Sequence, residues 1–270
     1  MDGSSNVRHG AGASKAKSLA ELIRSAVQSS IRDHKRIGLL FSGGVDSTCL
    51  AIAARKHADV TLYLCGTPDS QDMTWGREVA YTLDLPTVEV EVTKENVLAS
   101  LEDLVNNHGL DNPRWATTFI GFNMAVPMVE EGLVMSGQGA DELFGGYRKY
   151  AETAPEEAEK MMLADLKELR DEEAPLYRRI ADSQGKRLSV PFLEQKIVDY
   201  GIRLPYDTKL SENRNKAVLR DAARLLGVPE VVAERPKKAM QYGSGVSKIL
   251  KEYLKEAGMD LSDVMVQLSG

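Results

Sequence analysis

Short apolar runs alternate with longer amphipathic stretches along the first half of the chain. Apolar side chains recur at helical spacing between residues 18 and 34, which predicts an amphipathic helix there. The run at 36–41 is short and apolar, as expected of a buried strand. Three more strands are predicted at 59–66, 87–92 and 132–137. Helices are predicted between them at 47–57, 69–85, 95–109 and over most of 115–131.

The second half of the chain shows helical periodicity. Helices are predicted at about 155–172, 192–203, 214–226 and 244–257. Strands that alternate with helices indicate βαβ units and a parallel sheet. We therefore expect an α/β fold with a parallel-sheet core over 18–150 and a helical C-terminal part of the same domain over 151–270. The Gly/Ser-rich residues 1–17 are expected to form a disordered tail.

The stretch SGGVDS at 42–47 lies between the first predicted strand and the helix after it. Its glycines let the backbone approach a ligand closely, and successive N–H groups in such a turn bind anions. The helix N-terminus and two serine hydroxyls make the loop suitable for a phosphate or pyrophosphate. Asp46 fits this site if Mg²⁺ accompanies the anion, because Mg²⁺ takes one or two carboxylates together with phosphate oxygens. The simpler interpretation is a strand–helix turn in which Asp or Ser caps the helix.

A second glycine-rich loop follows the fourth predicted strand. The stretch MSGQGADELFGGYRKY at 135–150 contains two adjacent acids, Asp141 and Glu142. Because parallel sheets bind ligands at the carboxyl ends of their strands, this loop is expected to lie beside the first one. Asp141 would then be a second carboxylate for Mg²⁺, opposite Asp46. Alternatively, both acids are surface charges at the start of a helix.

Composition narrows the class of protein. The chain is 43% hydrophobic and 27% charged, as in ordinary soluble globular proteins. A net charge of −6 disfavours nucleic acid as the main partner, since phosphate binding needs an excess of Lys and Arg. The two cysteines form no disulfide framework and the four histidines do not cluster, so a cytoplasmic location and no histidine or cysteine metal site are expected. No apolar run reaches the roughly 18 residues of a membrane span.

Four ordered motifs resemble those of one enzyme family. SGGxDS after a first strand resembles the pyrophosphate loop of the N-type ATP pyrophosphatases, the PP-loop class with an adenine nucleotide α-hydrolase-like fold. The loop at 135–150 is similar to the SG-x-G-[SA]-DE-[LV]-F-GGY segment of asparagine synthetases and their β-lactam synthetase relatives. The stretches 190–210 and 215–246 resemble two further segments of their synthetase domain. The resemblance implies an AMP- and pyrophosphate-forming ligase that activates a carboxylate as an acyl-adenylate.

The resemblance also implies roles for individual residues. Pyrophosphate would be bound by Ser42, Gly43, Gly44, Asp46 and Ser47, and Mg²⁺ by Asp46 and Asp141. The adenosine of ATP would contact the strand end Leu64–Cys65–Gly66 and the pair Ser136–Gly137. Lys237 matches the family's catalytic lysine and would offset charge near the α-phosphate, although a slip of one residue would give that role to Lys238. Gln138 occupies a further catalytic position.

Three departures from the family pattern bear on the nitrogen source and the substrate. Residues 1–35 are too few for the N-terminal glutaminase domain of asparagine synthetases, which we expect to be absent. Nitrogen would then come from free ammonia, a separate glutaminase subunit or another amine. Gln138 stands where many members have Glu, and Gln cannot take a proton. Arg187 and Ser189 replace a Glu and an Arg near the family's acyl-substrate side, so the acid can differ from aspartate, the first candidate.

Other functions stay open at this point. A tRNA-modifying PP-loop enzyme of the sulfur-transferring kind needs reactive cysteines, whereas Cys49 and Cys65 are expected inside a helix and at a buried strand end. The chain is also compatible with a synthetase subunit of a larger complex, an inactive ATP-binding regulator, or a homodimer. Intact Asp46, Asp141 and Lys237 argue against the inactive regulator.

Overall fold

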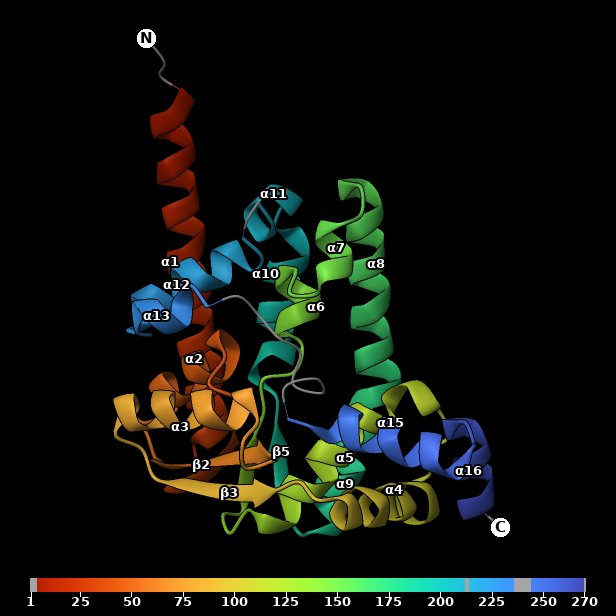
Figure 1. Ribbon diagram of the computed structural model, residues 1–270. Coiled ribbons are helices and arrows are strands. Elements are labelled where there is room, and N and C mark those ends of the chain that lie inside the picture. Colours follow the sequence, from red (N-terminus) through yellow and green to blue (C-terminus); the bar gives the residue numbers. More distant parts are fainter. Residues whose placement is uncertain (1–3, 212–213, 236–243, 270) are drawn as a thin grey trace.

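A five-stranded parallel sheet forms the centre of the computed structural model, which describes residues 4–211, 214–235 and 244–269 (Figure 1). The strand order is β3-β2-β1-β4-β5, and every neighbouring pair is parallel. The strands are β1 (Arg36–Leu40), β2 (Asp59–Gly66), β3 (Thr87–Glu91), β4 (Leu133–Met135) and β5 (Arg187–Ser189). The predicted α/β class with a parallel-sheet core is confirmed.

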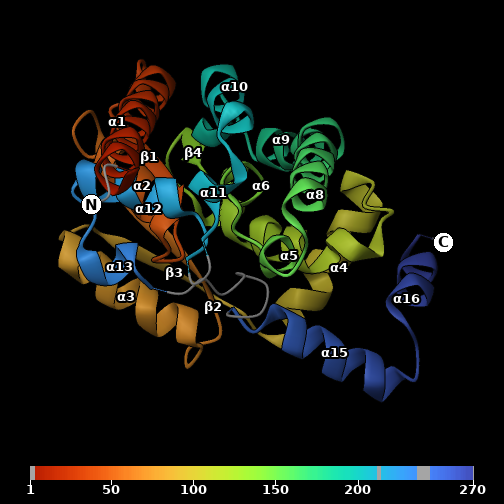
Figure 2. The same cartoon turned by 90° about the horizontal axis from the view of Figure 1, so that it is seen from above.

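Helices cover both faces of the sheet, which is why its central strands are apolar on both sides (Figures 1 and 2). One face packs against α1 (Ser4–Ile31), α2 (Val45–Ala54), α3 (Gln71–Leu83), α10 (Gln195–Arg203) and α12 (Ala217–Leu226). The other packs against α4 (Lys94–His108), α5 (Ala116–Ala125), α9 (Ala174–Ser183), α15 (Val246–Ala257) and α16 (Leu261–Leu268). No helix within the described residues is long and apolar enough to cross a membrane.

Shorter helices complete the chain beyond β4. They are α6 (Ala140–Phe144), α7 (Arg148–Ala151), α8 (Pro155–Glu168), α11 (Tyr206–Lys209) and α13 (Glu230–Ala233), with a single 3₁₀ turn at Pro191–Leu193. Two further 3₁₀ turns, at Pro113–Trp115 and Val126–Met128, flank α5 before β4. A π-helical turn at Leu169–Glu173 joins α8 to α9 without a break. Such turns concentrate at functional sites, and this one lies beside the cavity described below.

The strand order creates a ligand crevice between β1 and β4. From β1 the chain moves outward in one direction to β2 and β3, and β4 then returns to the opposite side of β1. The connections therefore diverge from the carboxyl ends of these two strands, which is where open α/β sheets bind ligands. The loops that follow β1 and β4 are the two glycine-rich loops singled out in the sequence.

The secondary structure differs from the prediction in two places. Helix α1 starts at Ser4, so the predicted disordered tail over 1–17 is wrong for its described part. Ala16 is buried, Lys15 Nζ donates to Thr208 Oγ1 at 3.1 Å, and the Tyr200 hydroxyl donates to the Lys15 carbonyl at 2.7 Å. These contacts hold the helix at Lys15 and Ala16, before its apolar stripe begins at Leu19. The predicted helical part over 151–270 also contributes a strand, β5, whose three residues give too short a pattern to predict.

A buried carboxylate stabilises the end of the sheet away from the crevice. The Glu131 side chain is 1% exposed and accepts hydrogen bonds from Thr61 Oγ1 at 2.7 Å and the Tyr63 hydroxyl at 2.8 Å. Burial opposes its ionisation, but these hydrogen bonds outweigh burial and hold the pKa of Glu131 below its usual range. The Tyr63 hydroxyl also accepts from the Glu130 backbone N–H at 3.0 Å.

Replacement of Tyr63 by Phe should destabilise the fold. The change leaves Glu131 and the Glu130 N–H each without one partner, so we expect the free energy of unfolding to fall by about 1–3 kcal/mol in urea denaturation. The matched control is Tyr81→Phe, because Tyr81 is 89% exposed; it should change stability by less than about 0.5 kcal/mol. Equal losses in the two variants would contradict the assignment.

Candidate active site

The first glycine-rich loop is shaped by Trp75 of α3. Gly43 has φ +67°, and a Cβ added there would lie 2.8 Å from Trp75 Cδ1. The Trp75 indole N–H donates to the Gly43 carbonyl at 2.7 Å, which fixes the tip of the loop. Glycine is therefore required at 43 for its backbone conformation and for this close contact.

Backbone N–H groups at the start of α2 have no side-chain cap. Gly44 is the N-cap of α2 and no side chain caps the helix, so N–H groups of its first turn remain available. The hydroxyls of Ser42 and Ser47 lie 3.4 Å apart, and Ser42 Oγ accepts from the Gly44 N–H at 3.3 Å. These contacts are long for hydrogen bonds, so a phosphate can exchange with them at little cost. The alternative of an Asp- or Ser-capped turn is wrong, because neither side chain caps α2.

The second loop lies directly against the first. After β4 the chain passes through Ser136 and Gly137, and a Cβ on Gly137 would lie 3.5 Å from Asp46 Cβ. The Ser136 N–H donates to the Ser189 carbonyl of β5 at 2.9 Å, which anchors the loop to the sheet. The crevice at the switch point thus brings the two predicted loops together.

Lys216 joins the two predicted metal ligands. Its ammonium lies 2.6 Å from Asp46 Oδ2 and 2.7 Å from Asp141 Oδ1, and its side chain is 1% exposed. Burial alone would lower the pKa of Lys216, but Asp141 and Asp46 outweigh it and hold the pKa above its usual value. A Cβ on Gly146 would meet both Asp141 and Lys216, so glycine is needed there as well. Three segments of the chain therefore meet around one positive charge.

The sequence predictions missed Lys216. It lies in the NKAVLR segment that carried part of the family resemblance, but the local sequence gives no sign that its ammonium reaches Asp46. Its position follows from the packing of α12 on α1 and α2, and its backbone is left-handed with φ +55° at the N-cap of α12. Only the tertiary structure reveals this contact.

The two carboxylates fit a divalent cation. The Lys216 ammonium contacts both carboxylates, so a metal ion bound near that point could also contact both. Asp46 Oδ1 is buried and accepts no hydrogen bond from the described residues, which leaves an oxygen suited to a cation. The described residues contain no group of three or more His, Cys, Asp or Glu that could hold a metal. Two carboxylates with phosphate oxygens are the usual ligands of a nucleotide-bound Mg²⁺.

A cavity of about 270 Å³ opens above these groups. Most of the predicted site residues line it: Ser42, Gly44, Asp46, Ser47, Ser136, Gly137, Gln138 and Asp141. Gly43, Leu64 and Cys65 do not line it; Leu64 is buried in the core, and burial raises the pKa of Cys65 to about 12. Contact of that strand end with adenosine stays a prediction.

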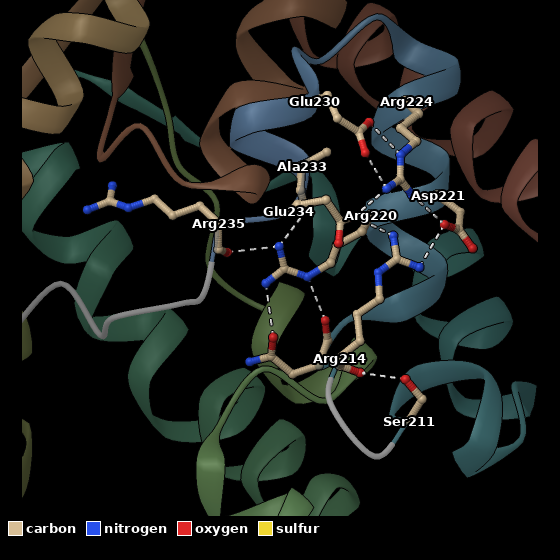
Figure 3. A network of polar contacts seen from close by, with 10 residues as sticks. Ser211, Arg214, Arg220, Asp221, Arg224, Glu230, Ala233, Glu234 and Arg235 are labelled. Atoms are coloured by element: carbon tan, nitrogen blue, oxygen red, sulfur yellow. Dashed lines mark hydrogen bonds and ion pairs between the residues drawn. The ribbon is translucent and has the colours of Figure 1, made fainter.

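Cations gather on the phosphate side of this cavity. Besides Lys216, its lining includes Arg220 and Arg235. Arg220 is 2% exposed and donates to the carbonyls of Ala233 at 2.5 Å and Arg235 at 3.0 Å, within the network drawn in Figure 3. The Arg235 guanidinium lies over the Trp75 ring at 4.2 Å. The predicted catalytic Lys237 and its neighbour Lys238 lie outside the described residues.

The cavity lining also contains acidic and aromatic side chains. Its lining includes Trp115, Tyr177, Glu142 and Glu173. Burial, followed by the charges of Glu142 and Glu168, raises the pKa of Glu173 to about 7. The sequence predictions missed Glu173 because it lies in a run of acids that looked like the solvated face of a helix. The run continues through the π-helical turn, which brings Glu173 to the cavity.

The two departures in β5 lie away from the cavity. Arg187 is exposed, pairs in register with Leu133 at the start of β4, and does not line the cavity. Ser189 is buried and contributes its carbonyl to Ser136. Neither side chain brings charge to the acyl-substrate side of the cavity among the described residues.

Replacement of Lys216 by Met should destabilise the protein and increase its response to Mg²⁺. The change leaves two adjacent carboxylates without their shared cation, which costs about 3–5 kcal/mol when a buried pair is broken. Added Mg²⁺ should then raise the Tm of the variant more than that of the unchanged protein, since the ion supplies the missing charge.

The matched control is Lys209→Met. Lys209 is 5% exposed, and burial lowers its pKa to about 8, so its removal should not produce the same loss. An equal Mg²⁺ response in the unchanged protein and in Lys216→Met, measured by thermal unfolding, would contradict a common cation position.

Comparisons with known proteins identify the family. The family model described as "Asparagine synthase" matches residues 18–160 and 150–264. A putative asparagine synthetase [glutamine-hydrolyzing] 1 of Methanocaldococcus jannaschii is 30% identical over 89% of this chain and 51% of its own length. Asparagine synthetase B of Escherichia coli is 26% identical over 91% of this chain and 48% of its own length.

Among solved structures, a predicted subunit of tRNA methyltransferase from Methanocaldococcus jannaschii matches with a TM-score of 0.38 and 14% identity. It covers 84% of this chain and 89% of its own, a likeness too low to carry an argument. The chain spans about half the length of the curated relatives it matches. By its family-model match over most of its length, the chain belongs to the asparagine synthase family.

Proposed function

We propose that the chain is an ATP-dependent amide ligase that forms AMP and pyrophosphate. A substrate carboxylate attacks the α-phosphorus of ATP, the bond to the β-phosphate oxygen breaks, and pyrophosphate leaves with the electron pair. The resulting acyl-adenylate then reacts with ammonia or an amine to give an amide and AMP. Membership of the asparagine synthase family makes aspartate the first acid to test.

One observation carries this proposal: two glycine-rich loops meet at the switch point with Asp46 and Asp141 around a single positive charge. The arrangement combines open N–H groups for phosphate with paired carboxylates for its cation. A metal-dependent site for a polyphosphate needs both features, and a simple structural turn needs neither.

Different residues along the cavity would bind the phosphates, supply positive charge and position the carboxylates. The N–H groups of residues 43–47 and the hydroxyls of Ser42 and Ser47 bind and orient the leaving pyrophosphate. Arg220, fixed by carbonyl contacts from α13, brings a buried positive charge near the phosphates. Lys216 bridges the two carboxylates and holds them in place. These fixed charges stabilise the negative charge that develops on the phosphates.

Asp46 and Asp141 would hold Mg²⁺ together with phosphate oxygens. When bound, the ion supplies positive charge that neutralises the phosphates. We further propose Lys237 as the cation near the α-phosphate, on the strength of its place in the RPKK segment shared with the family.

Free ammonia is the simplest nitrogen source, and a separate glutaminase subunit could deliver it. The relatives carry "glutamine-hydrolyzing" in their names and are about twice the length matched here. An assay that supplies ammonia directly therefore tests the synthetase chemistry without any such partner.

Sulfur transfer to tRNA is disfavoured by both cysteines. Cys49 is fully buried in α2, where burial strongly raises the pKa of its thiol. Burial also raises the pKa of the Cys65 thiol, to about 12. Neither thiol forms the thiolate that nucleophilic sulfur chemistry needs at neutral pH.

The proposal predicts acid-dependent release of AMP and pyrophosphate from MgATP. The purified chain would be incubated with ammonia and a panel of carboxylic acids headed by aspartate, and the amide identified by mass spectrometry. Asp46→Asn should lower the rate at least about 100-fold, because it removes one of the paired carboxylates. Lys237→Ala should lower adenylation by a similar factor.

Asp69→Asn is the matched control for charge, since Asp69 is exposed on the loop after β2; it should retain activity. Release of ADP and inorganic phosphate in place of AMP and pyrophosphate would overturn the proposal. So would an unchanged rate in Asp46→Asn.

A further inference from the structure

The second half of the reaction needs a proton acceptor, and Gln138 cannot be one. This inference rests on the proposed function. An ammonium ion or protonated amine must lose a proton before its nitrogen can attack an acyl-adenylate. The Gln138 side chain lines the cavity and is hydrogen-bonded to the Tyr177 hydroxyl, and its Oε1 is buried without a partner. An amide in this position can orient a neighbour or a substrate N–H but cannot carry a proton away.

Glu173 lies in the same half of the cavity as Gln138. It ends the π-helical turn between α8 and α9, one helical turn before Tyr177, and both side chains line the cavity. None of the hydrogen bonds and ion pairs of the described residues involves Glu173. The carboxylate is therefore not committed to a structural partner, unlike Asp165 and Glu168 on α8, which pair with Lys149 and Arg114.

The charges that raise the pKa of Glu173 come from three elements and are all carboxylates, two of which, Asp165 and Glu168, are paired with Lys149 and Arg114. Glu142 of α6 also lines the cavity, Glu168 and Asp165 are on α8, and Glu172 is the preceding residue of the π-helical turn. The cations of the cavity, Lys216, Arg220 and Arg235, gather on its phosphate side. The cavity is thus divided: an anionic adenylate is favoured on one side and a positively charged amine on the other.

We propose that Glu173 binds the incoming ammonium or amine in the acidic half of the cavity and accepts its proton. The proton passes to the Glu173 carboxylate, and the freed lone pair forms a bond to the carbonyl carbon of the acyl-adenylate. The bond from that carbon to the phosphate oxygen breaks, and AMP leaves with the electron pair. A second proton leaves the nitrogen for water, which yields the neutral amide.

Burial and the surrounding carboxylates suit Glu173 to this task. Its pKa of about 7 means that near neutral pH the group is ionised often enough to accept a proton and basic enough to hold it. An ordinary glutamate would be a much weaker base. The Gln138–Tyr177 pair fills the adjacent wall without adding another negative charge.

Glu173→Gln should separate the two half-reactions. Adenylation, measured as acid-dependent exchange of labelled pyrophosphate into ATP, should stay within about twofold. Amide formation should fall about 100-fold, the usual contribution of a general base. The matched control is Glu156→Gln at the start of α8, which should leave both rates unchanged, because Glu156 is exposed and is not among the charges that act on Glu173. Glu173→Asp should recover part of the amide rate.

The pH profile provides a readout that a merely structural role would not alter. With total ammonia fixed, the unchanged protein should show a rate that rises to about pH 7 and then levels off, as Glu173 becomes ionised. In Glu173→Gln the rate should instead keep rising with unit slope above pH 7, following free ammonia alone.

Stability gives a second measurement that is independent of activity. A carboxyl whose pKa is raised on folding destabilises the protein as pH rises from about 4.5 through 7. Glu173→Gln should therefore raise the Tm at pH 8 and leave it nearly unchanged at pH 4.

The outcomes are distinguishable. Loss of exchange and of amide formation by the same factor in Glu173→Gln would overturn the role of Glu173 and leave the ligase intact. A full amide rate in that variant would also overturn it. Absence of exchange with every acid in the unchanged protein would instead overturn the ligase, and the role of Glu173 with it.

Discussion

The contact of one buried ammonium with two carboxylates organises the site. Asp46 follows β1, Asp141 follows β4, and Lys216 precedes α12, so the charges tie together three segments that are far apart in the sequence. Two largely buried carboxylates this close would repel each other, and the ammonium removes that repulsion. This geometry requires glycine at 146, where a Cβ would meet Asp141 and Lys216, and it holds the backbone of Lys216 in the left-handed region.

The same contact explains how the crevice can be stable without a nucleotide and still receive one. Lys216 supplies the positive charge at a position that also suits a metal ion. A triphosphate brings several negative charges, so the ammonium finds new acceptors when the carboxylates turn to another cation. The hydroxyls of Ser42 and Ser47 are similarly held by long contacts that phosphate oxygens can replace. In the proposed function, nucleotide binding would exchange these interactions for new ones and leave no charge unpaired, which limits the cost of reorganisation.

Much of this site could be predicted because strand ends have a fixed geometry. Asp46 and Asp141 each lie in a glycine-rich loop after a buried strand, and parallel strands bring such loops to one edge. Lys216 and Glu173 could not be found in this way. Lys216 reaches Asp46 through the packing of α12, and Glu173 lines the cavity from the π-helical turn at Leu169–Glu173, which the sequence pattern does not reveal. The strand β5 was missed because three residues are too few to show a period. The part of α1 before its apolar stripe was missed because residues of α10 and α11 contact it at Lys15, and the local sequence does not show these contacts.

The division of charge across the cavity gives a physical meaning to Gln138. A carboxylate there would be a third acid beside Glu142 and Glu173 in a space that already raises the pKa of Glu173 to about 7. Like charges in such surroundings cannot all ionise, so the added acid would be protonated or would push Glu173 out of the useful range. A neutral amide avoids that conflict and still fixes Tyr177. The neutral Gln138 and the raised pKa of Glu173 therefore belong to one electrostatic arrangement. In this arrangement the proposed proton acceptor is Glu173, between α8 and α9, and position 138 of the loop stays neutral.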